Sequence, residues 1–144
     1  MENDNKARIF LVDDDVVFLK TLEIEFLQQP DIIVETFSTG ELCIDNLSRN
    51  PDVIILDYNL DGINKTAMNG LATLDKIKEY NPEINVVMLS SQDKIDVAIS
   101  CMHHKAFDYV IKSETSFIRL QKIITAIFTY KKIEKELKWY MERM

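Results

Sequence analysis

Six polar residues stand at the ends of apolar runs in this sequence, and together their side chains could carry phosphoryl-transfer chemistry. They are Asp13, Asp14, Asp15, Asp57, Ser90 and Lys112. Carboxylates in one cleft repel one another unless a cation is bound, and Mg²⁺ prefers oxygen ligands. A lysine beside such a cation can pair with a phosphoryl group, and a hydroxyl can donate a hydrogen bond to it. These residue types predict phosphoryl transfer onto a carboxylate, with Mg²⁺ as the cofactor.

Four of these residues also have an ordinary structural interpretation. Asp14 or Asp15 alone would be an N-cap of the helix that follows, and Ser90 alone could cap a helix near Ile95. Lys112 alone would be a surface lysine. The functional interpretation therefore requires that the whole set lies together, which depends on the elements that carry it.

Five apolar runs of strand length alternate with five helical patterns. We expect strands at 7–12, 32–37, 53–56, 84–89 and 107–111, and helices at about 16–28, 40–47, 71–80, 95–104 and from 116 to the end. Three of the runs are continuously apolar, which is typical of strands buried on both faces of a parallel sheet. The alternation predicts an open α/β sheet with right-handed crossovers, whose ligand site lies at the carboxyl ends of the strands.

The length and composition of the chain restrict the class of protein. It has 144 residues, of which 47% are hydrophobic, and a net charge of −7 at pH 7. Such a chain can form one domain with one core, and its negative charge argues against direct contact with nucleic acid. Neither a membrane span nor a signal-peptide core is found in the sequence, so we expect a cytoplasmic protein without a membrane partner. Cys43 and Cys101 are expected to be buried free thiols.

The ordered motifs resemble the receiver domains of bacterial two-component response regulators. The resemblance rests on LVDDD, VIILDYNLDG, VVMLSS and DYVIK, and it extends from Arg8 to about Tyr130. Ser90 and Lys112 lie 22 residues apart, with Tyr109 three before the lysine, as in that family. The resemblance implies a flavodoxin-like (βα)5 fold: a doubly wound open sheet of five parallel strands in the order 2-1-3-4-5.

The resemblance also implies an acceptor and a metal site. Asp57 would be the phosphoacceptor, which receives its phosphoryl group from a sensor histidine kinase. Asp14 would bind Mg²⁺ directly and Asp13 through water. Asp57 itself and the backbone carbonyl of Asn59 would complete the metal site.

Further residues would respond to the phosphoryl group, again by resemblance. Ser90 would contact it, Lys112 would pair with it, and Tyr109 would be the aromatic switch that turns inward. Asn59 and Gln92 match the two variable positions that tune how fast water removes the group. A charge of about −2 added at the acceptor would thus change the face made by the fourth helix, the fifth strand and the fifth helix.

Two positions depart from the family pattern. If Gly70 matches the glycine that usually follows the phosphoacceptor, the loop at 61–70 is longer by about five residues. It is either a tolerated surface insertion, or its residues 64–69 form a partner-specific lip over Asp57 that limits access or contacts the kinase. Lys105 stands where the family usually has a glycine, so the helix at 95–104 would end without a left-handed glycine cap.

The last helical pattern is longer than the fold requires. Its apolar residues recur at alternating spacings of three and four, which is a heptad seam. The seam comprises Ile123, Ala126, Tyr130, Ile133, Leu137, Tyr140 and Met144. We expect a receiver domain at 1–130 and a helical extension at 131–144 that projects roughly 20 Å. Its apolar stripe would pair two copies in a homodimer or begin a linker to an output domain absent from this chain; alternatively, the helix folds back or frays.

Two other functions fit parts of the pattern. The spacing of Asp13 and Asp15 after IFLV also resembles the opening motif of haloacid-dehalogenase-type phosphatases, but that interpretation leaves Asp57 unexplained. A phosphorylation-independent, receiver-like interaction module would not need the complete polar set, which this chain retains. The predicted function is therefore a switch that catalyses only its own phosphorylation and dephosphorylation, either standing alone or, as we favour, at the front of a longer regulator.

Overall fold

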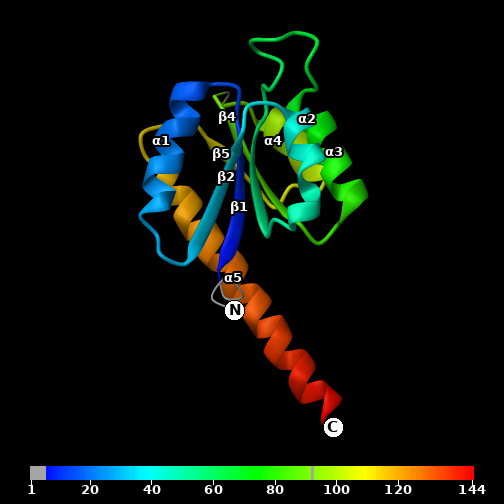
Figure 1. Ribbon diagram of the computed structural model, residues 1–144. Coiled ribbons are helices and arrows are strands. Elements are labelled where there is room, and N and C mark those ends of the chain that lie inside the picture. Colours follow the sequence, from blue (N-terminus) through cyan, green and yellow to red (C-terminus); the bar gives the residue numbers. More distant parts are fainter. Residues whose placement is uncertain (1–5, 92) are drawn as a thin grey trace.

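The apolar runs form the strands of one parallel sheet, with helices on both faces (Figure 1). The computed structural model describes residues 6–91 and 93–144. The strands are β1 (Ala7–Val12), β2 (Ile32–Phe37), β3 (Val53–Asp57), β4 (Asn85–Ser90) and β5 (Asp108–Ile111). Neighbouring strands are parallel, in the order β2-β1-β3-β4-β5. The predicted flavodoxin-like class and strand order are confirmed.

The helices follow the predicted alternation, with small differences at their ends. They are α1 (Val16–Leu27), α2 (Gly40–Asp45), the 3₁₀ helix η2 (Leu47–Arg49), α3 (Gly70–Tyr80), α4 (Ile95–His103) and α5 (Ser116–Glu142). The expected helix at 40–47 is thus divided into α2 and a short 3₁₀ turn. β3 and β4 each extend one residue beyond the expected strand, so that Asp57 and Ser90 are the last residues of their strands.

Each face of the sheet has its own hydrophobic core because side chains alternate along the strands. In β1, Ile9 and Leu11 pack with α1 and α5, whereas Phe10 and Val12 pack with α2, α3 and α4. Figure 1 shows the same division, with α1 and α5 on one side of the sheet and the other three helices opposite. Burial of each such aliphatic side chain contributes about 1.5–3 kcal/mol, and this packing fixes the strand ends.

Side-chain caps fix where the helices begin. Asp15 is the N-cap of α1 and accepts a hydrogen bond from Phe18 N–H at 3.1 Å. Thr39 and Asn69 cap α2 and α3 in the same way. The ordinary interpretation therefore holds for Asp15, which satisfies a free amide of the first helical turn.

α4 ends without a glycine cap, as expected, but its end is still left-handed. Lys105 has a φ of 72°, in the left-handed region, so the helix has a left-handed cap although the residue is not glycine. Lys105 N–H donates to Met102 O at 3.0 Å, and Ala106 N–H donates to Cys101 O at 3.1 Å. These are the two hydrogen bonds of a Schellman motif, which satisfy carbonyls that the helix leaves unpaired. The left-handed cap thus forms without a glycine, because these bonds outweigh the conformational cost of the lysine.

α5 continues as one helix far beyond the sheet (Figure 1). Its buried residues end at Ile127, and the seam residues that follow are exposed: Ile133 by 56%, Leu137 by 58% and Tyr140 by 65%. Its start is tied to the end of β5, because Ser113 N–H donates to Ser116 Oγ at 2.7 Å. Within the described residues, none of the helices, α5 included, combines the length and apolarity that crossing a bilayer requires.

Both cysteines lie in the core between the sheet and α2, α3 and α4, as expected. Burial raises the pKa of the Cys43 thiol to about 12 and that of the Cys101 thiol to about 11. Both are protonated at neutral pH and act as small apolar side chains.

Candidate functional site

Three aspartates meet where β1 and β3 end. Val12 is paired with Leu56 across the two strands, so Asp13 and Asp57 extend from the same level of the sheet edge. Asp13, Asp14 and Asp57 each offer a carboxylate oxygen, and these oxygens lie within 4.8 Å of one another. Asp13 and Asp57 are each 2% exposed, whereas Asp14 is partly exposed. The acidic cluster expected from the sequence is therefore present, and Asp14 is its member nearest to solvent.

Lys112 brings a positive charge to this cluster from the far edge of the sheet. It follows β5, yet its Nζ lies 2.8 Å from Asp13 Oδ2 and 3.5 Å from Asp57 Oδ1. Phe18, in the first turn of α1, faces the ammonium group, with its ring centroid 4.8 Å from Nζ. An aromatic face attracts a cation, so Phe18 helps to hold Lys112 in place. The sequence reasoning missed this contact; its one signal is an aromatic residue one turn beyond Asp15.

Burial and repulsion raise the proton affinity of the predicted acceptor. The pKa of Asp57 is raised to about 7, first by burial and then by the charge of Asp13. Lys112 and the backbone N–H of Asn59, which donates to Asp57 Oδ1 at 3.2 Å, oppose this rise. Burial lowers the pKa of Lys112, but the hydrogen bond to Asp13 and the charges of the aspartates outweigh burial, so that this pKa is raised overall. Burial and the charge of Asp13 thus outweigh Lys112 in their effect on the pKa of Asp57.

The oxygen donors of this cluster fit a hard divalent cation. Asp13 Oδ2 is buried and pairs with Lys112 at 2.8 Å, and among the described residues it has no other hydrogen-bond partner. Mg²⁺ and Ca²⁺ prefer carboxylate and carbonyl oxygens, and a cation here would relieve the mutual repulsion. The cluster of Asp13, Asp14 and Asp57 could therefore hold a metal ion. The carbonyl oxygen of Asn59 lies on the Asp14 side of the cluster, close to Gly62.

The remaining predicted residues lie around the cluster. Ser90 is fully buried at the end of β4, and its carbonyl accepts a hydrogen bond from Lys112 N–H at 2.8 Å. Ser90 does not cap α4, whose N-cap is Lys94. Tyr109 is half-buried in β5 and packs against the core shared with α4. Gln92, predicted to tune hydrolysis, lies outside the described residues.

A family comparison matches this arrangement to known proteins. The response regulator receiver domain model matches residues 9–126. The chain belongs to this family. The match contains β2 to β5 and most of β1, and it ends beside Ile127, the last buried residue of α5.

Curated relatives of this receiver domain are bacterial regulators. It is 33% identical over 104 residues to the DNA-binding transcriptional regulator NtrC of Klebsiella pneumoniae, covering 72% of this chain and 21% of NtrC. It is 32% identical over 114 residues to the nitrate/nitrite response regulator protein NarL of Escherichia coli K12, covering 78% of this chain and 50% of NarL. The chain thus spans between about a fifth and a half of the length of these relatives.

Solved structures share the fold. The receiver domain of NtrX from Brucella abortus has a TM-score of 0.73 and 27% identity, covering 83% of this chain and 96% of that one. The signal receiver domain of a putative Luxo repressor protein from Vibrio parahaemolyticus has a TM-score of 0.78 and 22% identity, covering 92% and 97%. The second likeness, at its lower identity, supports the fold alone.

Proposed function

We propose that this receiver domain is a phosphorylation-activated switch, with Asp57 as the phosphoacceptor and a sensor histidine kinase as the donor. The observation that carries this proposal is the position of Asp57, which is buried between Asp13 and Lys112 at the carboxyl edge of the sheet. A kinase donor implies that the domain acts in the cytoplasm. The transcriptional relatives support an output domain elsewhere in a longer regulator.

The residues of the site have separate roles in the transfer. A carboxylate oxygen of Asp57 forms a bond to phosphorus while the phosphorus–nitrogen bond to the donor histidine breaks, and the imidazole nitrogen keeps the electron pair. Lys112 and the hydroxyl of Ser90 bind the oxygens of the transferred group. Because the aspartates hold Lys112 in position before transfer, little reorganisation is needed when the negative charge arrives.

Asp13, Asp14, Asp57 and the carbonyl of Asn59 would hold Mg²⁺. Receiver domains generally bind this ion at an acidic pocket, and the donor set here fits it. When bound, Mg²⁺ supplies positive charge that neutralises the carboxylates and the phosphoryl oxygens.

The phosphoryl group would change the face formed by α4, β5 and α5. Lys112 directly follows β5, and Ser90 accepts its backbone N–H, so movement of either residue toward the phosphoryl group displaces the end of β5. Tyr109, half-buried beside α4, would turn inward as Ser90 is engaged. A partner that binds one of the two states more tightly then converts phosphorylation into a signal.

The experiment is incubation with a small phosphodonor, acetyl phosphate, and Mg²⁺, followed by intact mass measurement. The wild type should gain one phosphoryl group, and Asp57→Asn should gain none. Asp61→Asn, which removes a carboxylate from the neighbouring loop, is the matched control and should be phosphorylated normally. No gain in the wild type would favour the alternative of a phosphorylation-independent interaction module. An equal gain in Asp57→Asn would overturn the assignment of Asp57 as the phosphoacceptor.

The exposed seam of α5 supports a second proposal, a homodimer formed through residues 131–144. Ile133, Leu137 and Tyr140 recur at heptad spacing and are each more than half exposed. Two identical stripes of this kind can pack knobs into holes, which buries the apolar surface of both. A linker to an output domain is the alternative occupant of this segment.

A further inference from the structure

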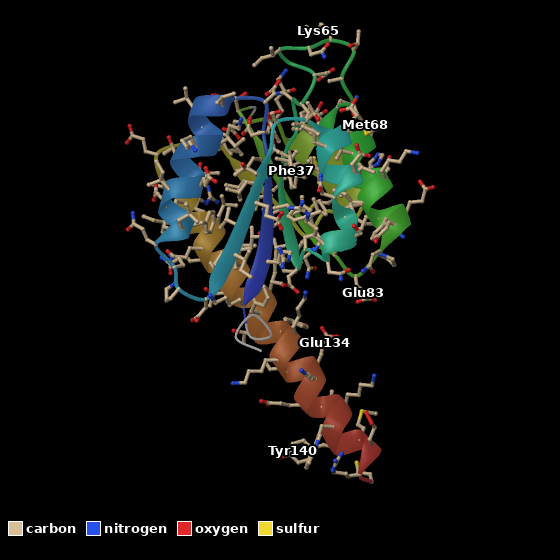
Figure 2. All side chains as sticks on the ribbon, in the orientation of Figure 1. Phe37, Lys65, Met68, Glu83, Glu134 and Tyr140 are labelled. Carbon is tan, nitrogen blue, oxygen red and sulfur yellow. The ribbon has the colours of Figure 1, made fainter. Side chains whose placement is uncertain are left out.

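The loop between β3 and α3 rises above the carboxyl edge of the sheet (Figure 1). Figure 2 shows Lys65 at its outer end and Met68 on the branch that returns toward the helices. The sequence pattern left the loop at 61–70 as a passive insertion or, through residues 64–69, as a lip over Asp57. The contacts of the outgoing branch instead connect the loop to the acidic cluster, and those of the returning branch fix the loop against the fold.

The returning branch is fixed against the fold. Met68 N–H donates to Glu41 Oε2, a side chain of α2, at 2.9 Å. Gly70 N–H donates to Tyr58 O at 3.1 Å. A Cβ on Gly70 would lie only 2.5 Å from the carbonyl oxygen of Asp57, so a glycine is needed for this close approach. The loop therefore returns to the backbone of the predicted acceptor.

In the outgoing branch, two consecutive backbone amides donate hydrogen bonds to two oxygens of the cation site. Gly62 N–H donates to Asn59 O at 3.1 Å, and Ile63 N–H donates to Asp14 Oδ2 at 3.1 Å. A Cβ on Gly62 would lie 3.2 Å from Asn59 O and 3.4 Å from Asp14 Oδ2, so the backbone packs tightly against both groups. These oxygens belong to two of the groups proposed above as Mg²⁺ ligands.

We infer that the amides of Gly62 and Ile63 are positioning groups for the cation, which makes the long loop part of the metal site. The inference rests on the proposed Mg²⁺ site. Asp14 is the partly exposed carboxylate of the cluster, so it would otherwise be free to rotate in water. A hydrogen bond to a ligating carboxylate fixes its orientation, and loss of such a partner commonly weakens metal binding by about 10- to 100-fold.

The coupling also acts in the opposite direction. If the Ile63 amide favours the metal-bound orientation of Asp14, then the bound metal favours the conformation of the loop that supplies this amide. Mg²⁺ should therefore slow hydrogen exchange of the amides at positions 62 and 63 more than that of amides at the loop tip. A loop that is a passive insertion would show no such selective protection.

The test compares Ile63→Pro, which removes the amide hydrogen, with two controls. Ile63→Ala keeps the amide, and because the Ile63 side chain is 76% exposed this change removes little packing. Lys65→Pro places the same ring in the same loop but leaves both amides in place. Calorimetric titration with Mg²⁺ alone should show binding about tenfold weaker in Ile63→Pro and within about twofold of wild type in both controls.

The outcomes separate this inference from the proposed function. If the wild type binds no Mg²⁺, the proposed metal site fails and the inference fails with it. If the wild type binds Mg²⁺ and Ile63→Pro binds it equally well, the inference alone is overturned. If Ile63→Pro fails to fold, hydrogen exchange on the wild type decides the question, because absence of Mg²⁺-induced protection at residues 62 and 63 contradicts the inference.

Discussion

Lys112 and Asp13 form an ion pair of 2.8 Å although they follow β5 and β1, which are separated in the sheet by β3 and β4. The lysine side chain thus reaches past the ends of β4 and β3 to an acid that follows β1. Its ammonium group supplies positive charge to the same carboxylates that would bind a metal ion. This pair therefore sets the charge balance of the site before any ligand arrives.

Removal of the lysine charge should separate metal binding from phosphorylation. In Lys112→Met, Asp13 and Asp57 lose their counter-charge, so the metal-free protein should lose roughly 2–3 kcal/mol of unfolding free energy. Mg²⁺ should bind more tightly than in wild type, because a competing cation is absent, whereas phosphorylation from acetyl phosphate should fall steeply. Urea denaturation, calorimetry and intact mass measure the three quantities.

Lys131 provides the control for that variant. It lies 3.6 Å from Asp52, and both partners are more than a third exposed. Lys131→Met should therefore change the unfolding free energy by less than about 1 kcal/mol and leave Mg²⁺ affinity unchanged. Weaker Mg²⁺ binding in Lys112→Met would contradict the proposed competition between lysine and metal.

The raised pKa of Asp57 predicts the pH dependence of the metal-free protein. A carboxyl group with a pKa of about 7 in the folded state and about 3.9 in the unfolded state binds more protons when folded. Unfolding free energy should therefore fall as pH rises from about 4 to about 7 and stay low above that range. The fall attributable to Asp57 should be at most about 4 kcal/mol, because each pKa unit corresponds to about 1.4 kcal/mol and the pKa of about 7 already includes the opposing charge of Lys112.

Urea denaturation at about pH 5 and about pH 7.5, in the presence of a metal chelator, measures this effect. Asp57→Asn cannot ionise, so it should lack this contribution and exceed the wild type in stability at the higher pH. Glu79→Gln, an exposed carboxyl on α3, is the control and should follow the wild type. Identical slopes in wild type and Asp57→Asn would exclude the shift.

The left-handed lysine predicts a stabilising substitution. Lys105→Gly should raise the unfolding free energy by about 1 kcal/mol, because glycine adopts the φ of 72° without the Cβ conflict. Lys105→Ala keeps the Cβ and should gain much less. Thermal or urea unfolding compares the two, and an alanine variant as stable as the glycine variant would show that the lysine charge, not its backbone, determines the difference.

A charge placed in the exposed seam of α5 should weaken self-association specifically. Leu137→Glu introduces a charge at the centre of the exposed stripe and should weaken the proposed dimer at least tenfold, while leaving monomer unfolding unchanged. Lys138→Glu, one residue away and outside the seam, should retain the dimer. Sedimentation equilibrium with and without beryllofluoride, a phosphoryl mimic, measures both. A wild type that is monomeric in both conditions would leave this helix as a linker.

The sequence was sufficient for the sheet and for most of the acidic cluster. Parallel strands end at one edge, so the residues after two buried apolar runs had to meet there, as Asp13 and Asp57 do. Helix starts could be located in the same way, since Asp15 and Asn69 have side chains suited to capping. Asp15 also illustrates why a run of three aspartates could not be assigned from residue type alone.

Other features have no local signature. The hydrogen bond from Ile63 to Asp14 uses a backbone amide, and any residue except proline could supply it. The left-handed conformation of Lys105 is held by hydrogen bonds to the end of α4, although lysine itself disfavours that conformation. The contact between Phe18 and Lys112 joins two segments whose distance depends on the completed sheet.

α5 is one unbroken helix that begins beside the candidate site, so a tilt at its start is transmitted along its whole length. Its 27 residues correspond to a rod of about 40 Å. Its first turn is hydrogen-bonded to Ser113, the residue after Lys112. If α5 tilted by about 5° about its first turn, its C-terminal end would move by roughly 3.5 Å. A displacement of about one ångström around one aspartate would then produce a larger displacement at the opposite end of the molecule.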